Sequence, residues 1–180
     1  RFRISSGAFF QTNSKAARIL LDQVTEDCGL TGSEVVWDLY SGTGTMAIGL
    51  ARAARKVIGF ELLQAAVSDS RTNAGLNGVE NCEFVLGDLK DLLGNSSLAN
   101  NYGSPQVVVT DPPRAGMHPS VVNQLLALEP PRIVYVSCNP ATLARDLKVL
   151  VEKYRLLRVQ PVDLFPHTAH VEAVAVLERK

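Results

Sequence analysis

The chain has 180 residues, of which 46% are hydrophobic and 20% are charged, and its formal net charge is zero. This length fits a single domain, and the apolar share can build a substantial core, which excludes a disordered chain. A neutral charge balance also argues against a strongly basic module that grips nucleic acid mainly through its phosphates.

The three cysteines, Cys28, Cys82 and Cys138, are widely spaced and form no C-x-x-C pair. This spacing argues against a disulfide framework or a zinc site and favours an intracellular, reducing compartment, either cytoplasmic or organellar. No apolar run reaches the roughly 18 residues that a membrane span needs. Because the chain begins at Arg1 rather than Met, we expect it to be a piece of a longer protein.

The predicted elements alternate between helices and strands along the chain. Asn13 is a good helix cap, and the apolar residues at helical spacing after it predict a first helix that ends at Gly29. The predicted strands are Val35–Leu39, Lys56–Glu61, Cys82–Leu86, Val107–Thr110, Ile133–Ser137, Leu156–Asp163 and Ala173–Glu178. The predicted later helices are Thr45–Ala54, Gln64–Asn77, Ser120–Leu128 and Ala141–Lys153, and the polar stretch Gly94–Pro105 is predicted to be a surface loop.

This alternation predicts an α/β chain with a Rossmann-like, mostly parallel seven-stranded sheet and helices on both faces. The last two strands have no helix between them, so we expect an antiparallel hairpin at one edge. Residues 1–30 are expected to form an N-terminal segment and helix that pack on a catalytic domain made of residues 31–180.

Ligands of such sheets bind at the carboxyl ends of the strands. The loop after the first strand contains Gly42 and Gly44, and its pattern also satisfies the dinucleotide signature G-x-G-x-x-A, so an NAD-dependent oxidoreductase stays an alternative. Three successive strands, however, bring acids to this edge: Asp38, Glu61 and Asp88. These acids would repel a pyrophosphate but suit a cationic sulfonium. We therefore predict an S-adenosylmethionine site, with Asp38 at the amino end, Glu61 at the ribose and Asp88 at the adenine amine.

The last three strand ends carry candidates for chemistry. Asp111 is followed by two prolines that fix the backbone, a pattern also found in methyltransferases that modify exocyclic amines of bases, so that activity is a second alternative. Cys138 stands at the tip of the fifth strand, before a helix that Pro140 can begin, and the helix dipole is expected to lower its pKa. Glu172 is a charged residue at the start of an otherwise apolar predicted strand. A carboxylate does not fit the burial pattern of such a strand, so Glu172 is a functional candidate.

A thiolate and a base suit methyl transfer to a carbon atom. C5 of uracil is a poor nucleophile until a thiolate adds to C6, and a base must afterwards remove the C5 proton. We predict Cys138 as the nucleophile and Glu172 as the base, with Asp111 holding the uracil edge or the transferring methyl group in register. His167 and His170 are interpreted as loop-shaping or substrate-contacting residues, and we expect no metal.

Six stretches together resemble the S-adenosylmethionine-dependent RNA 5-methyluridine methyltransferases, which act on transfer or ribosomal RNA. They span nearly the whole chain in order, and the S-C-N-P and D-P-P-R-A-G pieces are the most specific. The stretches are Phe9-Phe10-Gln11-Thr12-Asn13, Asp38-Leu39-Tyr40-Ser41-Gly42-Thr43-Gly44-Thr45, Gly59-Phe60-Glu61, Asp111-Pro112-Pro113-Arg114-Ala115-Gly116, Ser137-Cys138-Asn139-Pro140, and Asp163-Leu164-Phe165-Pro166-His167-Thr168 with His170-Val171-Glu172.

The resemblance implies roles for particular residues. It places five side chains in the cofactor site and repeats the roles of Cys138 and Glu172 as nucleophile and base; the five are Gln11, Tyr40, Glu61, Asp88 and Asp111. The chain departs from the family pattern at Ser41, where Cys is common, and at Thr45, a predicted cofactor-site residue where Asn is frequent.

The resemblance also implies an RNA partner and domains beyond this chain. Family members carry an N-terminal β-barrel and a central domain, sometimes with an iron–sulfur cluster. We therefore expect a monomer whose grip on tRNA or rRNA depends on such domains. A binding module that has lost its chemistry is a further alternative, against which the intact Cys138 and Glu172 argue.

Overall fold

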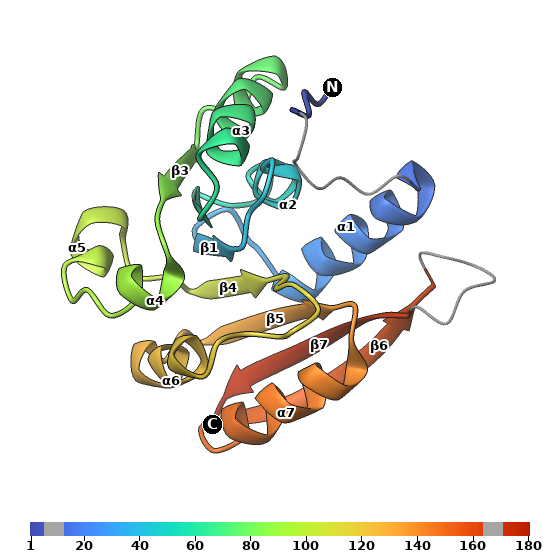
Figure 1. The fold of residues 1–180 in the computed structure, drawn as a ribbon, viewed down its shortest axis with the longest axis vertical. Coiled ribbons are helices and arrows are strands. Elements are labelled where there is room, and N and C mark those ends of the chain that lie inside the picture. Colours follow the sequence, from blue (N-terminus) through green and yellow to red (C-terminus); the bar gives the residue numbers. More distant parts are fainter. Residues whose placement is uncertain (6–12, 164–170) are drawn as a thin grey trace.

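A computed structural model of the chain describes residues 1–5, 13–163 and 171–180. Its centre is a seven-stranded sheet with the order β3-β2-β1-β4-β5-β7-β6 (Figure 1). The strands are β1 (Val35–Leu39), β2 (Lys56–Glu61), β3 (Cys82–Leu86), β4 (Val107–Thr110), β5 (Arg132–Ser137), β6 (Tyr154–Val162) and β7 (Glu172–Arg179). β1 to β5 are parallel to one another, whereas β7 runs antiparallel to both of its neighbours. The predicted fold class and the antiparallel hairpin at the edge are therefore confirmed.

Helices cover both faces of the sheet (Figure 1). They are α1 (Ser14–Cys28), α2 (Thr45–Leu50), α3 (Gln64–Leu76), α4 (Leu89–Leu92), α5 (Leu98–Tyr102), α6 (Pro119–Leu128) and α7 (Pro140–Leu150). Buried residues of α1, α2 and α3 form one apolar cluster with one face of the strands, and those of α4 to α7 form a second cluster with the other face. The strands between them read as nearly continuous apolar runs because both of their faces are buried.

The helix ends follow the chemistry that the sequence predicts. The side chain of Asn13 accepts a hydrogen bond from the Ala16 amide at 3.1 Å, and Gly29 adopts a left-handed conformation after α1. Pro140 begins α7, and its neighbour Asn139 caps the helix by accepting from the Ala141 amide at 3.0 Å. Cys138 therefore sits between the end of β5 and the capped start of α7.

Two predicted elements differ from the structure, and one short helix was not predicted. The stretch Gly94–Pro105, expected to be a surface loop, contains α5, and the short α4 lies just before it. The predicted helix Thr45–Ala54 ends at Leu50, after which the chain turns into β2. Helices of four to six residues present too little periodicity to be recognised, and the run of alanines after Leu50 resembles a continuing helix.

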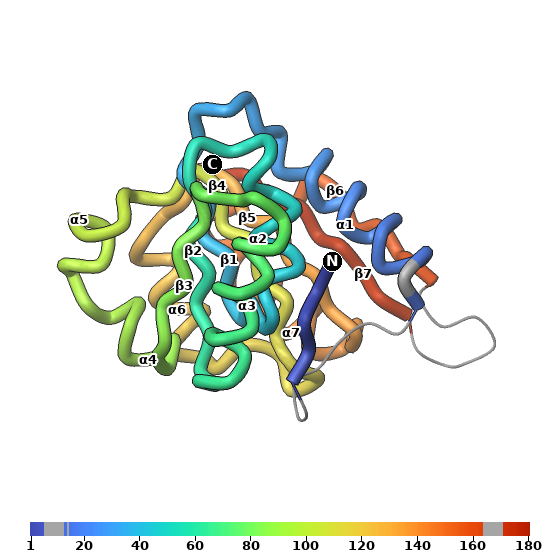
Figure 2. Tube along the Cα trace, turned by 90° about the horizontal axis from the view of Figure 1, so that it is seen from above, coloured from blue at the N-terminus to red at the C-terminus, as the bar shows by residue number. Residues whose placement is uncertain are grey.

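Parallel register brings the functional candidates to one edge. Leu39 of β1 pairs with Phe60 of β2 and with Thr110 of β4, and Thr110 pairs with Tyr135 of β5. The residues that follow these strands therefore emerge at the same edge of the sheet. Figure 2 shows this arrangement from above, with residues 1–5 running alongside α3.

Candidate active site

The loop between β1 and α2 depends on left-handed backbone at three positions. Tyr40, Gly42 and Gly44 have φ values of 62°, 54° and 84°. A Cβ atom on Gly44 would lie 2.9 Å from Cβ of Ser70, so only glycine fits there. A Cβ atom on Gly42 would meet nothing within 4 Å, so the backbone at Gly42 borders open space. A ligand can therefore approach the main chain closely at this point.

Glu61 fixes the shape of this loop. Its carboxylate accepts a hydrogen bond from the Gly42 amide at 2.9 Å and another from the Leu63 amide at 2.8 Å. A carboxylate has about four acceptor positions, so these two bonds leave capacity for the two hydroxyls of a ribose. The contact with Gly42 is one that the sequence did not predict.

Asp38 is buried rather than exposed at the strand end. The residue is 1% exposed, and its Oδ2 has no hydrogen-bond partner within residues 1–5, 13–163 and 171–180. Burial raises the pKa of this carboxyl well above its usual range, and the charges of Asp111 and Glu61 raise it further. The hydroxyl of Ser41 in the adjoining loop is likewise buried without a described partner. Unpaired buried acceptors beside the glycine loop fit a ligand that brings a cationic or donor group.

Asp88 and Tyr40 lie farther along this edge. Asp88 caps α4 by accepting from the Lys90 amide at 3.0 Å, and it also forms an ion pair with Nζ of Lys90 at 3.0 Å. These hydrogen bonds lower the pKa of Asp88. Burial raises the pKa of Tyr40 to about 12, and the charge of Asp88 contributes to that increase. Asp88 therefore remains a charged acceptor near Tyr40, although it is already paired. Gln11, a further predicted cofactor residue, lies outside the described residues.

Cys138 and Glu172 meet at the end of the β5–β7 ladder. Ser137 pairs with Ala173 in antiparallel register, so the next step of that register places Cys138 opposite Glu172. Glu172 is 5% exposed, whereas Cys138 is half-buried and retains access to solvent. The thiol is thus neither sealed in the core nor separated from the carboxyl group.

Carboxyl groups determine the electrostatics at this point. Burial raises the pKa of Glu172. Asp111 is exposed as a whole residue, yet protein atoms crowd its carboxyl group, and this desolvation together with the charge of Glu172 raises its pKa to about 7. The predicted lowering of the Cys138 pKa is wrong. Burial and the charges of Glu172 and Asp111 raise the pKa of this thiol, and the charge of Arg114 only partly opposes them.

Asp146 of α7, which the sequence analysis missed, connects the segments that carry Asp111 and Cys138. Its Oδ2 accepts from the Met117 amide at 2.9 Å and from the Tyr135 hydroxyl at 2.7 Å. Arg145 pairs with its Oδ1 and also donates to the Met117 carbonyl at 3.0 Å. These bonds join the loop after β4 to β5 and α7. The signal was present, because Asp146 interrupts the apolar stripe of Leu143, Leu147 and Leu150 on α7.

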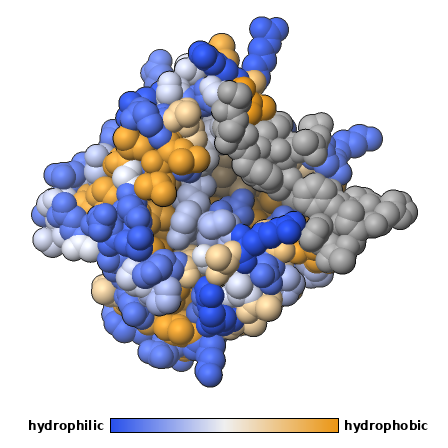
Figure 3. Space-filling view, in the orientation of Figure 1, coloured by the Kyte–Doolittle hydropathy of each residue, from blue (hydrophilic) through white to orange (hydrophobic). Residues whose placement is uncertain are grey.

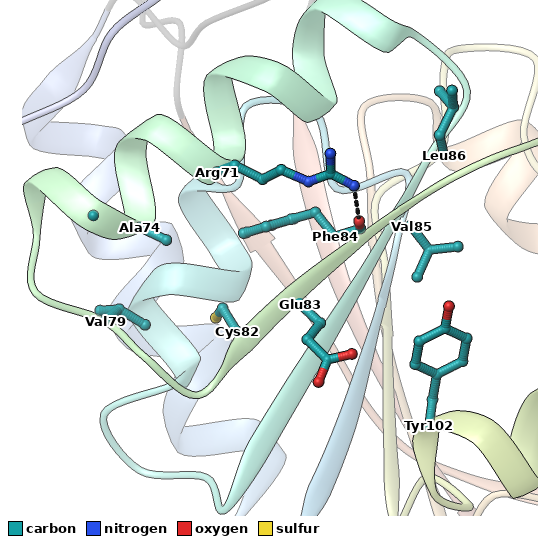
Figure 4. Close-up of a pocket in the computed structure, with 10 residues that line it drawn as sticks. Arg71, Ala74, Val79, Cys82, Glu83, Phe84, Val85, Leu86 and Tyr102 are labelled. Atoms are coloured by element: carbon teal, nitrogen blue, oxygen red, sulfur yellow. Dashed lines mark hydrogen bonds between the residues drawn. The ribbon is translucent and has the colours of Figure 1, made fainter.

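A cavity and a hydrophobic patch lie on another side of the molecule, and none of the predicted site residues that the structure describes lines the cavity. A cavity of about 650 Å³ runs along β3, and its lining includes Arg71, Phe84 and Tyr102 (Figure 4). Arg71 donates to the Phe84 carbonyl there at 2.8 Å. Figure 3 shows hydrophobic residues grouped on the side of the molecule where β3 lies in Figure 1.

Neither a metal nor a membrane span is indicated in the part of the chain that the structure describes. No group of three or more His, Cys, Asp or Glu side chains there has the arrangement of a metal site. None of the helices in residues 1–5, 13–163 and 171–180 combines the length and apolarity that crossing a bilayer requires. The predicted roles of His167 and His170 lie outside these residues.

Comparison with known proteins decides the family. A sequence model of the tRNA (Uracil-5-)-methyltransferase family matches residues 1–180. The chain belongs to this family. An RNA methyltransferase of Bacteroides thetaiotaomicron, uncharacterised, is 53% identical over 178 residues, which are 99% of this chain and 39% of the relative. A similar protein of Geobacter sulfurreducens is 49% identical over 181 residues, which are 100% of this chain and 36% of the relative.

Solved structures agree with this assignment. The tRNA (uracil-54, C5)-methyltransferase of Pyrococcus abyssi, in complex with S-adenosyl-L-homocysteine, is 40% identical with a TM-score of 0.83 over 98% of this chain and 41% of that chain. Precorrin-6y C5,15-methyltransferase of Geobacter metallireducens has a TM-score of 0.77 at 13% identity, covering 99% of this chain and 94% of that chain, and shows the fold alone.

Family membership selects among the sequence-based alternatives. It identifies the cofactor as S-adenosylmethionine rather than NAD, because the family is S-adenosylmethionine-dependent and a relative is solved with the demethylated product. It also favours uracil C5 over an exocyclic amine as the target. The chain spans well under half of the first relatives it matches, 39% in both cases, so the activity of the whole protein is a matter for proposal.

Proposed function

We propose that this chain is the catalytic part of an enzyme that methylates C5 of a uridine in tRNA or rRNA, with Cys138 as nucleophile and Glu172 as base. The observation that supports it most is the apposition of Cys138 and Glu172 at the end of the β5–β7 ladder, beside Asp111. A nucleophile and a base on facing strands can reach two neighbouring atoms of one flat ring. C6 and C5 of uracil are such a pair.

The residues at the other strand ends fit the cofactor. S-adenosylmethionine supplies an electrophilic methyl group when bound. Gly42 and Gly44 would allow it to approach the backbone, Glu61 would accept from its ribose, and Asp38 offers a buried, unpaired oxygen to its amino group. Tyr40, Thr45, Asp88 and Gln11 complete the proposed set, and Asp111 lies between this set and the nucleophile.

The side chains of this chain would then act in two steps. The sulfur of Cys138 bonds to C6, and the electron pair of the C5–C6 double bond moves onto C5 and the adjoining carbonyl, which makes C5 nucleophilic. Once C5 carries the methyl group, Glu172 removes the remaining C5 proton, the double bond reforms, and the sulfur leaves as thiolate. Asp111 would hold the uracil edge so that both atoms stay in register.

A covalent trap tests this proposal in the full-length protein. RNA that contains 5-fluorouridine cannot lose its C5 fluorine as a cation, so the protein–RNA adduct should accumulate and survive denaturing electrophoresis. We expect the adduct to disappear in Cys138→Ala and to persist in Cys82→Ala, a matched control because the Cys82 thiol is engaged with the Ala47 carbonyl at 3.4 Å. The Glu172→Gln variant should accumulate an adduct even with ordinary uridine.

The outcomes separate the alternatives. If the wild-type protein with S-adenosylmethionine forms no adduct on tRNA or on rRNA, the chain is a binding module rather than this catalyst. If Cys138→Ala still methylates C5, the covalent mechanism is wrong. Supplying tRNA and rRNA transcripts separately assigns the substrate class.

A further inference from the structure

Helix α3 carries three polar side chains four residues apart. Asp69, Asn73 and Asn77, the last of which caps the helix, lie on one face because this spacing is close to one helical turn. A stripe of this kind on a packed helix is normally apolar. Here it faces the N-terminal residues of the chain, which run alongside α3 in Figures 1 and 2.

The three side chains bind every second residue of that segment. Asn73 accepts from the Arg3 amide at 2.6 Å and donates to the Arg3 carbonyl at 3.0 Å. Asn77 donates to the Arg1 carbonyl at 2.7 Å. Asp69 accepts from the amide and the hydroxyl of Ser5 at 2.7 and 2.8 Å. Residues 1–5 are thus held as an extended strap, since alternate residues of extended backbone face the same way.

Asn73 differs from its two neighbours because it also reaches the cofactor loop. Its Nδ2 donates to the Thr43 carbonyl at 3.0 Å, and its side chain is fully buried. Thr43 lies between Gly42 and Gly44, the two left-handed glycines of that loop. One amide group therefore joins the strap to the segment that would approach the cofactor.

We propose that Asn73 is a positioning residue for S-adenosylmethionine binding, which couples the docking of residues 1–5 on α3 to the shape of the Gly42–Thr45 loop. The inference rests on the proposed function for its ligand but not for its methyl acceptor. If the docked strap favours the binding-competent loop, the bound cofactor must favour the docked strap to the same extent, because coupling between two binding equilibria is reciprocal.

Cofactor affinity in the full-length protein gives the first test. The Asn73→Ala variant loses the bond to Thr43, and the loss of one buried hydrogen bond should raise the dissociation constant of S-adenosylmethionine about five- to tenfold in titration calorimetry. The matched control is Asn77→Ala, which removes a strap contact but none to the loop, and should change that constant less than about twofold. At saturating cofactor, adduct formation with 5-fluorouridine RNA should proceed at the wild-type rate.

Amide hydrogen exchange gives a second test, and its first measurement needs only the wild-type protein. In the wild-type protein, S-adenosylhomocysteine should slow exchange at Arg3 and Ser5, although neither residue belongs to the proposed cofactor set. Without ligand, Asn73→Ala should speed exchange at Gly44, whose amide is bonded to the Ser41 carbonyl at 2.9 Å.

Two results would overturn the proposal. One is unchanged exchange at Arg3 and Ser5 in the wild-type protein when the ligand saturates it. The other is equal weakening of cofactor binding by Asn73→Ala and Asn77→Ala, which would mean that the strap matters only as a whole. Failure of the covalent trap, by contrast, would refute the uracil chemistry and leave this coupling standing.

Discussion

Replacing Asp146 by alanine removes the carboxylate that joins the loop after β4 to β5 and α7. The Met117 amide and the Tyr135 hydroxyl, both buried, would lose their acceptor. Each buried donor left without a partner costs about 1–3 kcal/mol, so the two together should lower the free energy of unfolding by about 2–6 kcal/mol. The pair with Arg145 adds little, because the Arg145 side chain is 52% exposed. This loss is a large share of the roughly 5–15 kcal/mol that stabilises a domain.

Urea denaturation followed by circular dichroism measures this loss as a change in the free energy of unfolding. Asp22→Ala is the matched control, because Asp22 also accepts from an arginine of its own helix but is exposed. We expect that control to change the free energy of unfolding by less than about 0.5 kcal/mol. If Asp146→Ala stays within about 1 kcal/mol of the wild type, the two buried donors have found other partners and the reasoning fails.

Three further predictions concern the cofactor and the thiol. Gly44→Ala should lower the free energy of unfolding by about 1–3 kcal/mol and weaken S-adenosylmethionine binding in calorimetry, because φ is 84° and the new Cβ would meet Ser70. The control is Gly75→Ala inside α3, where the new Cβ meets nothing within 4 Å, and this variant should stabilise the protein. The rate of adduct formation with 5-fluorouridine RNA should rise up to about tenfold per pH unit from pH 6 to 8, because the pKa of Cys138 is raised and its thiolate fraction grows with pH; a flat profile would refute this. Binding of S-adenosylmethionine near pH 7 should release protons, seen as a dependence of the calorimetric enthalpy on the buffer, because the sulfonium charge lowers the pKa of Asp111 from about 7; equal proton release with S-adenosylhomocysteine, which lacks that charge, would contradict it.

The backbone of this site was predictable because its signals are local. Four strands have the predicted bounds, since β-rich apolar runs ended by polar residues have no competing interpretation when both faces of a sheet are buried. Parallel register then brings Asp111 and Cys138 to one edge without any further information. The antiparallel hairpin brings Glu172 to the same place.

The electrostatics and the supporting contacts were not predictable in the same way. The helix dipole acts within one turn and can be inferred from sequence, but the desolvation of Cys138 and the approach of Glu172 depend on strands that meet only in the folded chain. Asp38 was predicted to meet the amino end of the cofactor, but nothing in the sequence indicated that its carboxyl group is buried, as the fourth residue of a five-residue strand buried throughout. Asn73 and Asp146 were visible only as polar interruptions of apolar helix faces, without a hint of their partners.

The buried carboxyl groups at the carboxyl ends of the strands cost the empty site folding free energy. Asp38 and Glu172 are buried at this edge of the sheet, and both have raised pKa values mainly because burial disfavours their ionised forms. A carboxyl whose pKa is higher in the folded than in the unfolded chain stabilises the fold less as pH rises, so these two groups oppose folding at neutral pH. A cation bound among them reverses that sign, because it favours the ionised forms that burial disfavours. Part of the free energy lost in burying these carboxyl groups is therefore recovered when a positively charged sulfonium is present, and less of it when the product, which lacks that charge, remains. The same arrangement that destabilises the empty site thus favours release of the product over release of the methyl donor.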